Sequence, residues 1–228
     1  MFWKNRRVLV TGGTGFIGSY VVERLVRMGA SVRVLDRLPE GSIRNIPHLA
    51  RDVRFIDGDC TDLEVVTSAC SGQDVVMNLA AHVGGIEYNR THQGLLLKDN
   101  LGIATTVIEG ARRASVERFL VVSSACVYPH DSIVPTPESE GDRSNPEETN
   151  GGYGWAKRMA EKIGQYYASE YGMKVGIVRP YNAYGPRDHF GPENSHVIPS
   201  LLERILSDEN PLVVWGSGNQ TRAFLYVE

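Results

Sequence analysis

The residues best suited to chemistry are a tyrosine and a lysine four positions apart, Tyr153 and Lys157. At the start of a predicted helix, this spacing places both side chains on one face. A phenol titrates at about pH 10 and is a poor base at neutrality. A neighbouring positive charge lowers that pKa, so Tyr153 can exchange a proton with an alcohol or a carbonyl. The same spacing also occurs on ordinary solvated helix faces, so further signals are needed.

Two serines at the end of a predicted strand provide one such signal. Ser123 and Ser124 close the apolar run 117–124. In a parallel sheet with helices on both faces, ligands bind beyond the carboxyl ends of the strands. We predict that Ser124 holds the reacting oxygen next to Tyr153 and Lys157.

A glycine-rich turn indicates an electron carrier. Gly12, Gly15 and Gly18 lie between the apolar run 6–11 and a helical pattern over 15–30. Glycines at this spacing allow a tight turn and a close approach to a pyrophosphate, which the positive end of the helix also favours. The turn therefore predicts a bound nicotinamide dinucleotide, which would accept or return a hydride while Tyr153 moves the proton. In its oxidised form the positive ring would act together with the Lys157 ammonium to lower the pKa of Tyr153.

An acid at the end of the second predicted strand indicates which dinucleotide binds. Asp36 lies 24 residues after Gly12, where an acid accepts hydrogen bonds from both ribose hydroxyls. Because a carboxylate repels a 2′-phosphate, we predict NAD and disfavour NADP. Arg37 and Arg33 weaken this prediction, since a guanidinium binds phosphate. Asp59, after the third predicted strand, either contacts the adenine amino group or begins the next helix.

Strands and helices alternate in the elements that must position these groups. This alternation predicts an α/β fold, a Rossmann-type doubly wound parallel sheet. The loop 129–152, rich in Pro, Glu and Ser, is predicted to be either a lid or an ordinary exposed loop. Apolar runs predict strands at 6–11, 31–36, 52–59, 74–81, 117–124 and 173–180, and helices are predicted at 15–30, after Thr61 or Asp62, at 92–114 and at 153–171.

The pattern changes after residue 180. A helix is predicted at 196–207, and two short strands are predicted around Gly216–Gly218. We therefore divide the chain into a dinucleotide-binding Rossmann domain, 1–180, and part of a small C-terminal substrate region, 181–228. The sequence stops within the apolar run FLYVE, so we expect this substrate region to be incomplete.

The composition excludes several classes of partner. A formal net charge of −3 over 228 residues argues against nucleic acid or an anionic membrane. No run approaches the roughly 20 apolar residues of a membrane span, and the N-terminus has no signal-peptide layout. Three cysteines, Cys60, Cys70 and Cys126, are typical of a reducing compartment. We expect a cytoplasmic protein with no metal site.

Five ordered motifs resemble those of the extended short-chain dehydrogenase/reductase family of nucleotide-sugar enzymes. They are TGGTGFIG at 11–18, NLAAHVGG at 78–85, SSACVYP at 123–129, YGWAK at 153–157 and RPYNAYGP at 179–186. The resemblance implies a nucleotide-sugar substrate and a homodimer formed by the helices at 92–114 and 153–171. It implies a cofactor site of Gly12, Gly15, Phe16, Ile17, Gly18, Asp36, Arg37, Asp59, Cys60, Leu79, Ala80, Ala81, Asn100, Tyr153 and Lys157.

Two segments resemble the GDP-L-fucose synthases and GDP-mannose 3,5-epimerases within this family. They are HVGGI at 82–86, together with SSACVYP, and NSHVIPSLL at 194–202. The likeness implies that Cys126 and His196 form an acid–base pair; the alternatives are a small buried thiol and a helix cap. It also implies a substrate site of His82, Gly84, Gly85 and Ser124, with Asn182 and Arg222 at the diphosphate.

These residues predict chemistry on a sugar ring. Oxidation at C4 makes the hydrogens on C3 and C5 acidic, and a thiol and an imidazole can exchange them because both titrate near neutrality. We predict an NAD-dependent nucleotide-sugar epimerase, with a GDP-hexose favoured. The alternatives are an NADPH-dependent epimerase–reductase of the GDP-L-fucose synthase type, a UDP-sugar 4-epimerase and a non-catalytic dinucleotide-binding scaffold. Ala125 and Cys126 stand where 4,6-dehydratases usually carry an Asp-Glu pair, which argues against dehydration.

Overall fold

A sheet of six parallel strands forms the centre of the structure, a computed structural model that describes residues 2–37, 42–191, 195–214 and 216–228. The strand order is β3-β2-β1-β4-β5-β6, which confirms the predicted Rossmann-type doubly wound sheet. The order reverses between β1 and β4, and in such sheets this is the point where ligands bind. The strands are β1 (Arg7–Thr11), β2 (Ser31–Asp36), β3 (Val53–Asp57), β4 (Val75–Asn78), β5 (Arg118–Val122) and β6 (Lys174–Val178).

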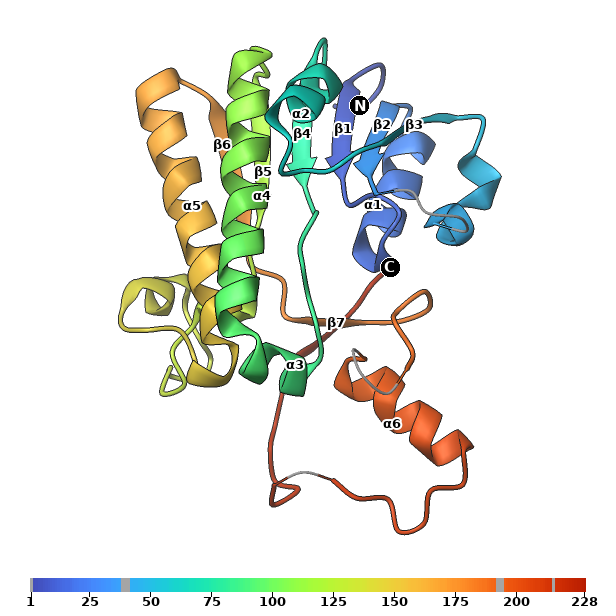
Figure 1. Cartoon of the computed structure of the whole chain (residues 1–228), viewed down its shortest axis with the longest axis vertical. Coiled ribbons are helices and arrows are strands. Elements are labelled where there is room, and N and C mark those ends of the chain that lie inside the picture. The colour runs from blue at the N-terminus through green and yellow to red at the C-terminus, as the bar shows by residue number, and fades with distance from the viewer. Residues whose placement is uncertain (1, 38–41, 192–194, 215) are drawn as a thin grey trace.

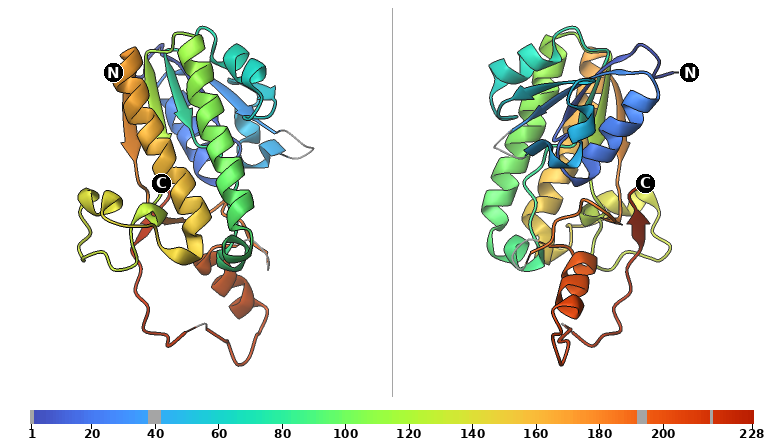
Figure 2. Two further views of the ribbon diagram at one scale, coloured as in Figure 1. Left: turned by 60° about the vertical axis from the view of Figure 1, so that its left-hand side comes forward. Right: turned by 90° about the vertical axis from the view of Figure 1, so that its right-hand side faces the viewer.

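Helices lie on both faces of this sheet (Figures 1 and 2). Helix α1 (Phe16–Arg27) lies on one face, while α2 (Leu63–Cys70), α4 (Gln93–Arg113) and α5 (Gly151–Tyr171) cover the other. Helices α4 and α5 run side by side over most of their length (Figures 1 and 2). Short elements complete the fold: α3 (Ile86–Thr91) and the 3₁₀ turns Ser42–Asn45, Pro47–Leu49, Ala125–Val127, Glu138–Asp142 and Glu148–Asn150.

Alternating residues of the strands build a separate core on each face. In β1, Val8 and Val10 belong to the cluster under α1, whereas Leu9 belongs to the cluster under α2, α4 and α5. All three side chains are fully buried. A strand covered on both faces is expected to be apolar without interruption, and this explains the near-continuous runs of Val and Leu.

Several predicted boundaries shift by a few residues for local reasons. Helix α5 begins at Gly151 rather than Tyr153, because the carboxylate of Glu147 accepts hydrogen bonds from the backbone N–H groups of Thr149 and Asn150 and starts the turn early. Asp62 is the N-cap of α2 and accepts from two N–H groups of its first turn. Strand β4 ends at Asn78, so residues 79–81 form a loop beyond the sheet edge.

The C-terminal segment, residues 181–228, lies beyond the carboxyl ends of the strands (Figure 1). It contains α6 (Val197–Leu206), as predicted, and a parallel pair formed by β7 (Asn182–Tyr184) and β8 (Phe224–Tyr226). The two strands predicted around Gly216–Gly218 do not form a local pair, because the described residues 212–214 and 216–223 contain turns and coil and the strand that follows, β8, pairs with β7. Both glycines have positive φ values, +81° and +79°, which bend the chain instead. The division at residue 180 stays a prediction.

No helix in the described parts of the chain combines the length and apolar character needed to cross a membrane.

Candidate active site

The glycine turn between β1 and α1 brings three backbone segments together without room for side chains. A Cβ atom on Gly12, whose φ is +66°, would lie 2.8 Å from the Cα of Ala80 after β4. A Cβ atom on Gly18 would lie 2.1 Å from the carbonyl oxygen of Gly12. Gly15 is the N-cap of α1 and no side chain caps the helix there. The first N–H groups of α1, at Phe16 and Ile17, are therefore available, and this arrangement fits a dinucleotide pyrophosphate.

Asp36 is held at the edge of this turn. One carboxylate oxygen accepts hydrogen bonds from the N–H and hydroxyl of Thr14, at 3.0 and 2.6 Å. The other accepts from the N–H of Arg37 at 3.0 Å. Thr14 was not among the predicted site residues, although a hydroxyl inside a glycine turn is a signal for such a contact. The carboxylate thus faces the place where the predicted cofactor ribose would lie.

The two arginines that weakened the NAD prediction lie in different surroundings. Arg33 donates to the carbonyl oxygens of Ala69 and Ser71 at the end of α2, at 2.5 and 3.2 Å. Burial lowers the pKa of this guanidinium. Because Arg33 is engaged on the α2 side of β2, Arg37 alone of the two is left exposed beside Asp36.

The end of β3 contributes an ordered turn and a buried thiol. Asp59 accepts from the N–H and hydroxyl of Thr61, at 2.8 and 2.7 Å, and these bonds lower its pKa. Asp62, not Asp59, caps α2, so the interpretation of Asp59 as the acid that begins the helix is wrong. Cys60 lies in the core, where burial raises the pKa of its thiol to about 12. Its contact with the cofactor stays a prediction.

A buried side chain of α4 holds the loop after β4 in place. The buried amide of Asn100 accepts from the N–H of His82 at 2.9 Å and donates to the carbonyls of His82 and Leu96, both at 2.8 Å. This holds the backbone of residues 79–82, including Leu79, Ala80 and Ala81, against the glycine turn. Asn100 thus supports the predicted cofactor site through the backbone.

His82 itself is enclosed by two side chains. Its Nδ1 lies 2.9 Å from a carboxylate oxygen of Asp99, and its Nε2 lies 3.1 Å from the hydroxyl of Tyr88. Gly84 leaves space for the same tyrosine, because a Cβ atom there would lie 2.4 Å from the Tyr88 ring. Gly85 is the N-cap of α3. Both ring nitrogens of His82 are therefore engaged, and its place in the sugar pocket stays a prediction.

Four predicted catalytic residues meet where β5 ends and α5 begins. The Oγ of Ser124 accepts from the N–H of Cys126 at 3.2 Å, and Ser124 lowers the pKa of the Tyr153 phenol. Lys157 donates from Nζ to the carbonyl of Val122 at 2.9 Å, and this nitrogen lies 5.4 Å from the centroid of the Tyr153 ring. A Cβ on Gly154 would lie 2.5 Å from the carbonyl oxygen of Cys126, so the glycine allows the two segments to approach.

Burial is the largest cause of the pKa shifts of Cys126, Tyr153 and Lys157. It lowers the pKa of Lys157 to about 8 and raises the pKa of the Cys126 thiol. It also raises the pKa of Tyr153 well above its ordinary value, which Ser124 only partly offsets. The expected fall in the pKa of Tyr153 depends on an oxidised nicotinamide as well as on Lys157, and without the cofactor burial sets the direction of the shift. A further positive charge close to the phenol is needed.

A buried ion pair lies directly behind this cluster. Ser123, the neighbour of Ser124, donates its hydroxyl to Glu161, whose side chain is 2% exposed. Arg179 donates twice to the same carboxylate, at 2.8 and 2.6 Å, and once to the carbonyl of Glu138 at 2.6 Å. Sequence reasoning missed Glu161 and Arg179, because neither has a local pattern that indicates a partner.

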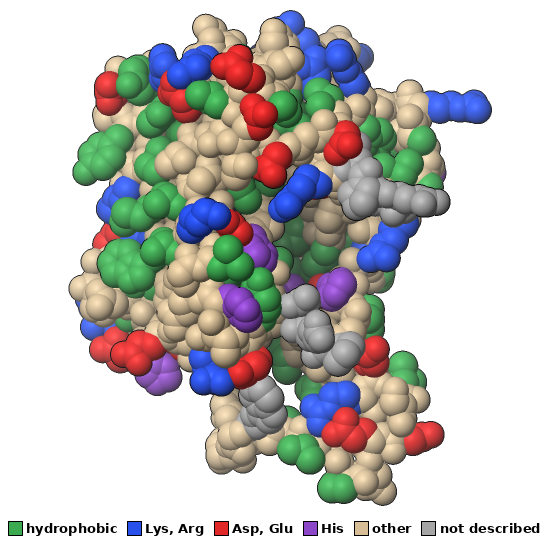
Figure 3. All heavy atoms as spheres, in the orientation of Figure 1, with side chains coloured by type: hydrophobic (Ala, Val, Ile, Leu, Met, Phe, Trp, Pro, Cys, Tyr) green, Lys and Arg blue, Asp and Glu red, His purple; other side chains and the backbone are tan. Residues whose placement is uncertain are grey.

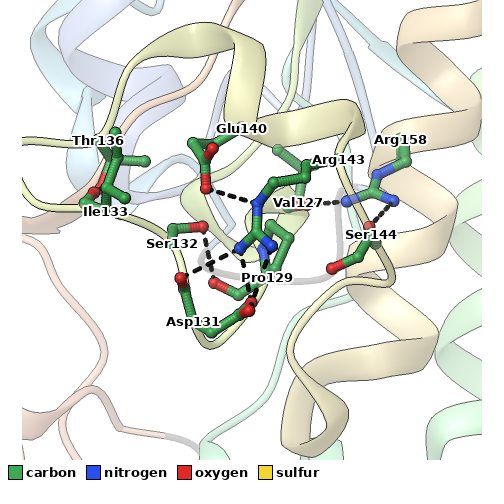
Figure 4. Close-up of polar contacts among 10 residues, drawn as sticks. All are labelled: Val127, Pro129, Asp131, Ser132, Ile133, Thr136, Glu140, Arg143, Ser144 and Arg158. Carbon is green, nitrogen blue, oxygen red and sulfur yellow. Dashed lines mark hydrogen bonds and ion pairs between the residues drawn. The ribbon is translucent and has the colours of Figure 1, made fainter.

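The loop 129–152 is tied down by arginines (Figure 4). Arg143 binds Asp131 at 2.6 Å and Glu140 at 2.8 Å within the loop. Arg158, from α5, donates to the carbonyl of Ser144 within the loop and to that of Val127 just before it. These contacts favour the interpretation of this segment as an ordinary ordered loop over that of a lid.

The remaining candidates lie on the C-terminal segment. His196 occupies the N-cap position of α6 without capping it, so the helix-cap interpretation of its side chain is wrong. Its Nδ1 instead lies 3.1 and 3.3 Å from the two oxygens of Asp188. Asn182 donates to the carbonyl of Ala223 at 2.8 Å, which brings the exposed Arg222 close to β7. Asn194 lies outside the described residues.

A hollow separates the C-terminal segment from the sheet and its helices, with several histidine side chains around its opening (Figure 3). Within the described residues, no hydrogen bond joins His196 to Cys126; Cys126 lies in the 3₁₀ turn after β5 and His196 at the start of α6. In the same residues, no cluster of His, Cys, Asp or Glu is suited to a metal ion.

The sequence matches the NAD dependent epimerase/dehydratase family over residues 8–228. It is 34% identical over 229 residues to GDP-L-fucose synthase 1 of Arabidopsis thaliana, a match that covers 99% of this chain and 66% of that protein. It is 31% identical to a dTDP-4-dehydro-6-deoxy-D-allose reductase of Streptomyces bikiniensis, with coverage of 99% and 70%. The chain thus spans about two thirds of the length of such relatives.

Solved structures agree with this likeness. An epimerase from Methanothermobacter thermautotrophicus superimposes with a TM-score of 0.86 at 31% identity, covering 99% of this chain and 66% of that one. A UDP-glucose 4-epimerase from Thermotoga maritima, solved with UDP-glucose, gives a TM-score of 0.84 at 30% identity, with coverage of 97% and 69%.

Proposed function

Because the chain belongs to the NAD dependent epimerase/dehydratase family, we propose that it binds NAD and serves as a nucleotide-sugar epimerase. The proposed reaction oxidises C4 of the sugar transiently and exchanges protons at C3 and C5, and a GDP-hexose is the favoured substrate. The observation that carries this proposal is the meeting of Ser124, Cys126, Tyr153 and Lys157 in one desolvated cluster at the carboxyl end of β5.

The proton chemistry falls to Tyr153. The bound cofactor supplies a positively charged hydride acceptor, which is the additional charge that the buried phenol needs. Tyr153 takes the proton of the C4 hydroxyl, and the hydroxyl of Ser124 holds that oxygen in place. Lys157, fixed by the carbonyl of Val122, contributes its positive charge close to the Tyr153 ring. In the reverse direction Tyr153 returns the proton to the C4 oxygen.

Once C4 is a ketone, Cys126 and His196 can exchange the neighbouring protons. One group removes a proton from C3 or C5, and negative charge then spreads onto the C4 oxygen, where Ser124 and Tyr153 stabilise it. The other group returns a proton to the opposite face of the carbon. The raised pKa of the buried Cys126 favours the thiol, so Cys126 fits the role of the acid.

Two observations support NAD over NADP. The Asp36 carboxylate is held at the edge of the glycine turn by Thr14, and Arg33 is engaged at the end of α2. A related dTDP-glucose 4,6-dehydratase from Streptomyces venezuelae, 27% identical, was solved with NAD bound. An enzyme that retains NAD returns its own hydride and leaves the substrate's oxidation state unchanged, which is the outcome of an epimerase.

The second candidate is an epimerase–reductase that consumes NADPH. It is favoured by the curated relatives named GDP-L-fucose synthase, one of them from Escherichia coli at 33% identity. A UDP-sugar 4-epimerase is a third candidate, because it needs Tyr153 and Lys157 but neither Cys126 nor His196. A non-catalytic scaffold is disfavoured, since the chain keeps the tyrosine and the lysine and places them together.

Solvent exchange distinguishes these candidates. The protein is incubated in D₂O with GDP- and UDP-hexoses and no added cofactor, and the sugars are followed by NMR. We expect deuterium at C3 or C5 and co-purified NAD. Inversion at C4 without deuterium would make the protein a 4-epimerase, and activity only with stoichiometric NADPH and a 4-keto sugar would make it an epimerase–reductase.

Variants of two tyrosines on α5 test the mechanism in the same assay. Tyr153→Phe is expected to reduce exchange by about 10³-fold, within the range seen for loss of a general acid–base group, while NAD still binds. Tyr166→Phe removes an equivalent hydroxyl from a residue that is 67% exposed on the same helix and should leave exchange unchanged. Full activity of Tyr153→Phe would contradict the proposed proton transfer.

A further inference from the structure

The strongest unassigned feature of the molecule is the carboxylate behind His196. Asp188 has a side chain that is only 2% exposed, although it lies in an irregular segment between β7 and α6. One of its oxygens accepts from the N–H of His189 at 2.8 Å, and both oxygens face the Nδ1 of His196, at 3.1 and 3.3 Å. A buried carboxylate in contact with one imidazole nitrogen determines which nitrogen of that ring carries the proton.

The backbone next to Asp188 is attached to helix α1. Arg187 pairs with Glu23 of α1 at 3.0 Å and donates to the hydroxyl of Ser19 at 3.2 Å. Its guanidinium lies 4.3 Å from the ring centroid of Tyr20. The Tyr20 hydroxyl in turn donates to the carbonyl of Pro186 at 3.1 Å. Residues 186–188 are thereby attached to α1, the helix whose N-terminus faces the predicted pyrophosphate.

This attachment holds Arg187 in a conformation that costs energy. Its φ is +70°, in the left-handed region that a non-glycine residue seldom adopts, and Gly185 two positions earlier has φ +147°. A strained residue of this kind costs on the order of 1 kcal/mol or more and persists only where surrounding contacts determine it. The contacts with α1 hold Arg187 in this conformation. The orientation of the neighbouring Asp188 is therefore set by the cofactor-binding half of the chain.

We propose that Asp188 is the positioning residue for His196: it accepts the Nδ1–H, leaves Nε2 as the nitrogen that exchanges a proton with the sugar, and is held relative to the cofactor site by the Arg187 contacts with α1. This inference rests on the proposed function and specifies one of its acid–base groups. The His196 side chain is 51% exposed, so one side of the ring is open to a substrate while the other faces Asp188.

The proton balance of this arrangement is simple. Neutral His196 keeps its hydrogen on Nδ1 and takes a proton from the carbon next to the ketone with the lone pair of Nε2. The resulting imidazolium is stabilised by the adjacent carboxylate, and the electron pair of the broken C–H bond moves toward the C4 oxygen. In the reverse step Nε2–H returns the proton. Asp188 is also the charged group that raises the pKa of His196.

The first arm of the test needs no substrate. Histidine-labelled protein is titrated by NMR, and the signal of His196 is identified by its loss in His196→Gln. In the unaltered protein we expect the neutral ring to carry its hydrogen on Nδ1. Asp188→Asn, which preserves size, should lower the pKa of His196 and mix the two tautomers. Unchanged signals of His82 and His48 show that the variant is folded.

A matched variant controls for the loss of one carboxylate. Glu209→Gln removes the same charge from the other end of α6, where the residue pairs with Arg204. It should leave the titration and tautomer of His196 unchanged. Equal titration curves for the unaltered protein and Asp188→Asn would overturn the proposal, and so would a neutral ring with its hydrogen on Nε2.

The second arm measures exchange. With a nucleotide sugar that takes up deuterium in the unaltered protein, Asp188→Asn should slow uptake by at least 10-fold and shift its pH profile, at unchanged NAD affinity. Asp188→Glu, which keeps the carboxylate, should restore part of the rate. Uptake at the full rate in Asp188→Asn would overturn the positioning role. If no sugar exchanges even in the unaltered protein, the proposed function fails, and the titration still decides whether Asp188 controls His196.

Discussion

The two halves of the site are held in different ways. Around the glycine turn and the tyrosine, backbone segments approach so closely that side chains are excluded, and polar groups such as Asn100 and Glu161 are buried with their partners. The C-terminal segment is mostly exposed: every residue of β8 is exposed, and Pro199 is the only buried residue of α6. The cofactor half is therefore preorganised, whereas the substrate half depends on a few contacts, chiefly those of Arg187 with α1.

The largest expected difference between the halves is in the unfolding free energy lost when an ion pair is broken. Glu161→Gln removes one member of the buried pair with Arg179, and loss of one partner of such a pair typically costs about 3–5 kcal/mol of unfolding free energy. Glu209→Gln removes the same charge from the exposed pair with Arg204, and exposed pairs contribute little. Urea denaturation measures both variants.

We expect a lower midpoint for Glu161→Gln and no measurable change for Glu209→Gln. Equal stabilities of the two variants would show that the buried pair behind Ser123 does not hold the cofactor half together.

Two glycines allow the same substitution to be compared in each half. Gly18→Ala places a methyl group 2.1 Å from the carbonyl of Gly12, and overpacking of this kind typically costs about 1–3 kcal/mol. It should also weaken NAD binding, because the turn and the start of α1 must separate. Gly218→Ala meets nothing within 4 Å and carries only the penalty of its φ of +79°.

Calorimetric titration with NAD and thermal unfolding measure these two variants. NAD affinity should fall for Gly18→Ala and stay unchanged for Gly218→Ala. A normal affinity in Gly18→Ala would contradict the role assigned to the glycine turn.

The parts of this architecture that sequence could predict are those with a local signature. The strands, the glycine turn and the pair Tyr153 and Lys157 follow from periodicity and spacing within a few residues. Asp36 was predicted because its distance from the glycines is fixed by the intervening helix and strand. The carboxyl ends of parallel strands meet at one edge, so Ser124 could be placed near Tyr153.

The parts that sequence did not predict depend on contacts between distant segments. The pairing of β7 with β8 joins residues about forty positions apart and replaced an expected local strand pair. Asp188 reaches His196, and Glu161 reaches Arg179, only through the folded chain. Burial raises the pKa of Tyr153, which no spacing reveals, and the expected fall depends on Lys157 and an oxidised nicotinamide together.

The smallest expected effects are pH-dependent contributions to stability, and they have opposite signs in the two halves. Burial lowers the pKa of Lys157 from 10.5 to about 8, so between these values the unfolded chain binds more protons and stability rises with pH. The slope is about 1 kcal/mol per pH unit at most from one group. His196, whose pKa is raised by Asp188, stabilises the fold fully below pH 6.5 and loses this contribution as pH rises through its folded pKa.

The unaltered protein, Lys157→Met and His196→Gln are each unfolded with urea across this pH range. The differences between them give the change of stability with pH that Lys157 and His196 each contribute. Relative to Lys157→Met, the unaltered protein should gain stability from pH 8 to 10. Lys162→Met, which removes a partly exposed ammonium from the same helix, controls for loss of a lysine. Relative to His196→Gln, the unaltered protein should lose stability as pH rises above 6.5. If the difference in stability between the unaltered protein and His196→Gln does not change with pH, His196 contributes nothing to the unfolding transition in which Lys157 takes part. The C-terminal segment then unfolds separately from the sheet.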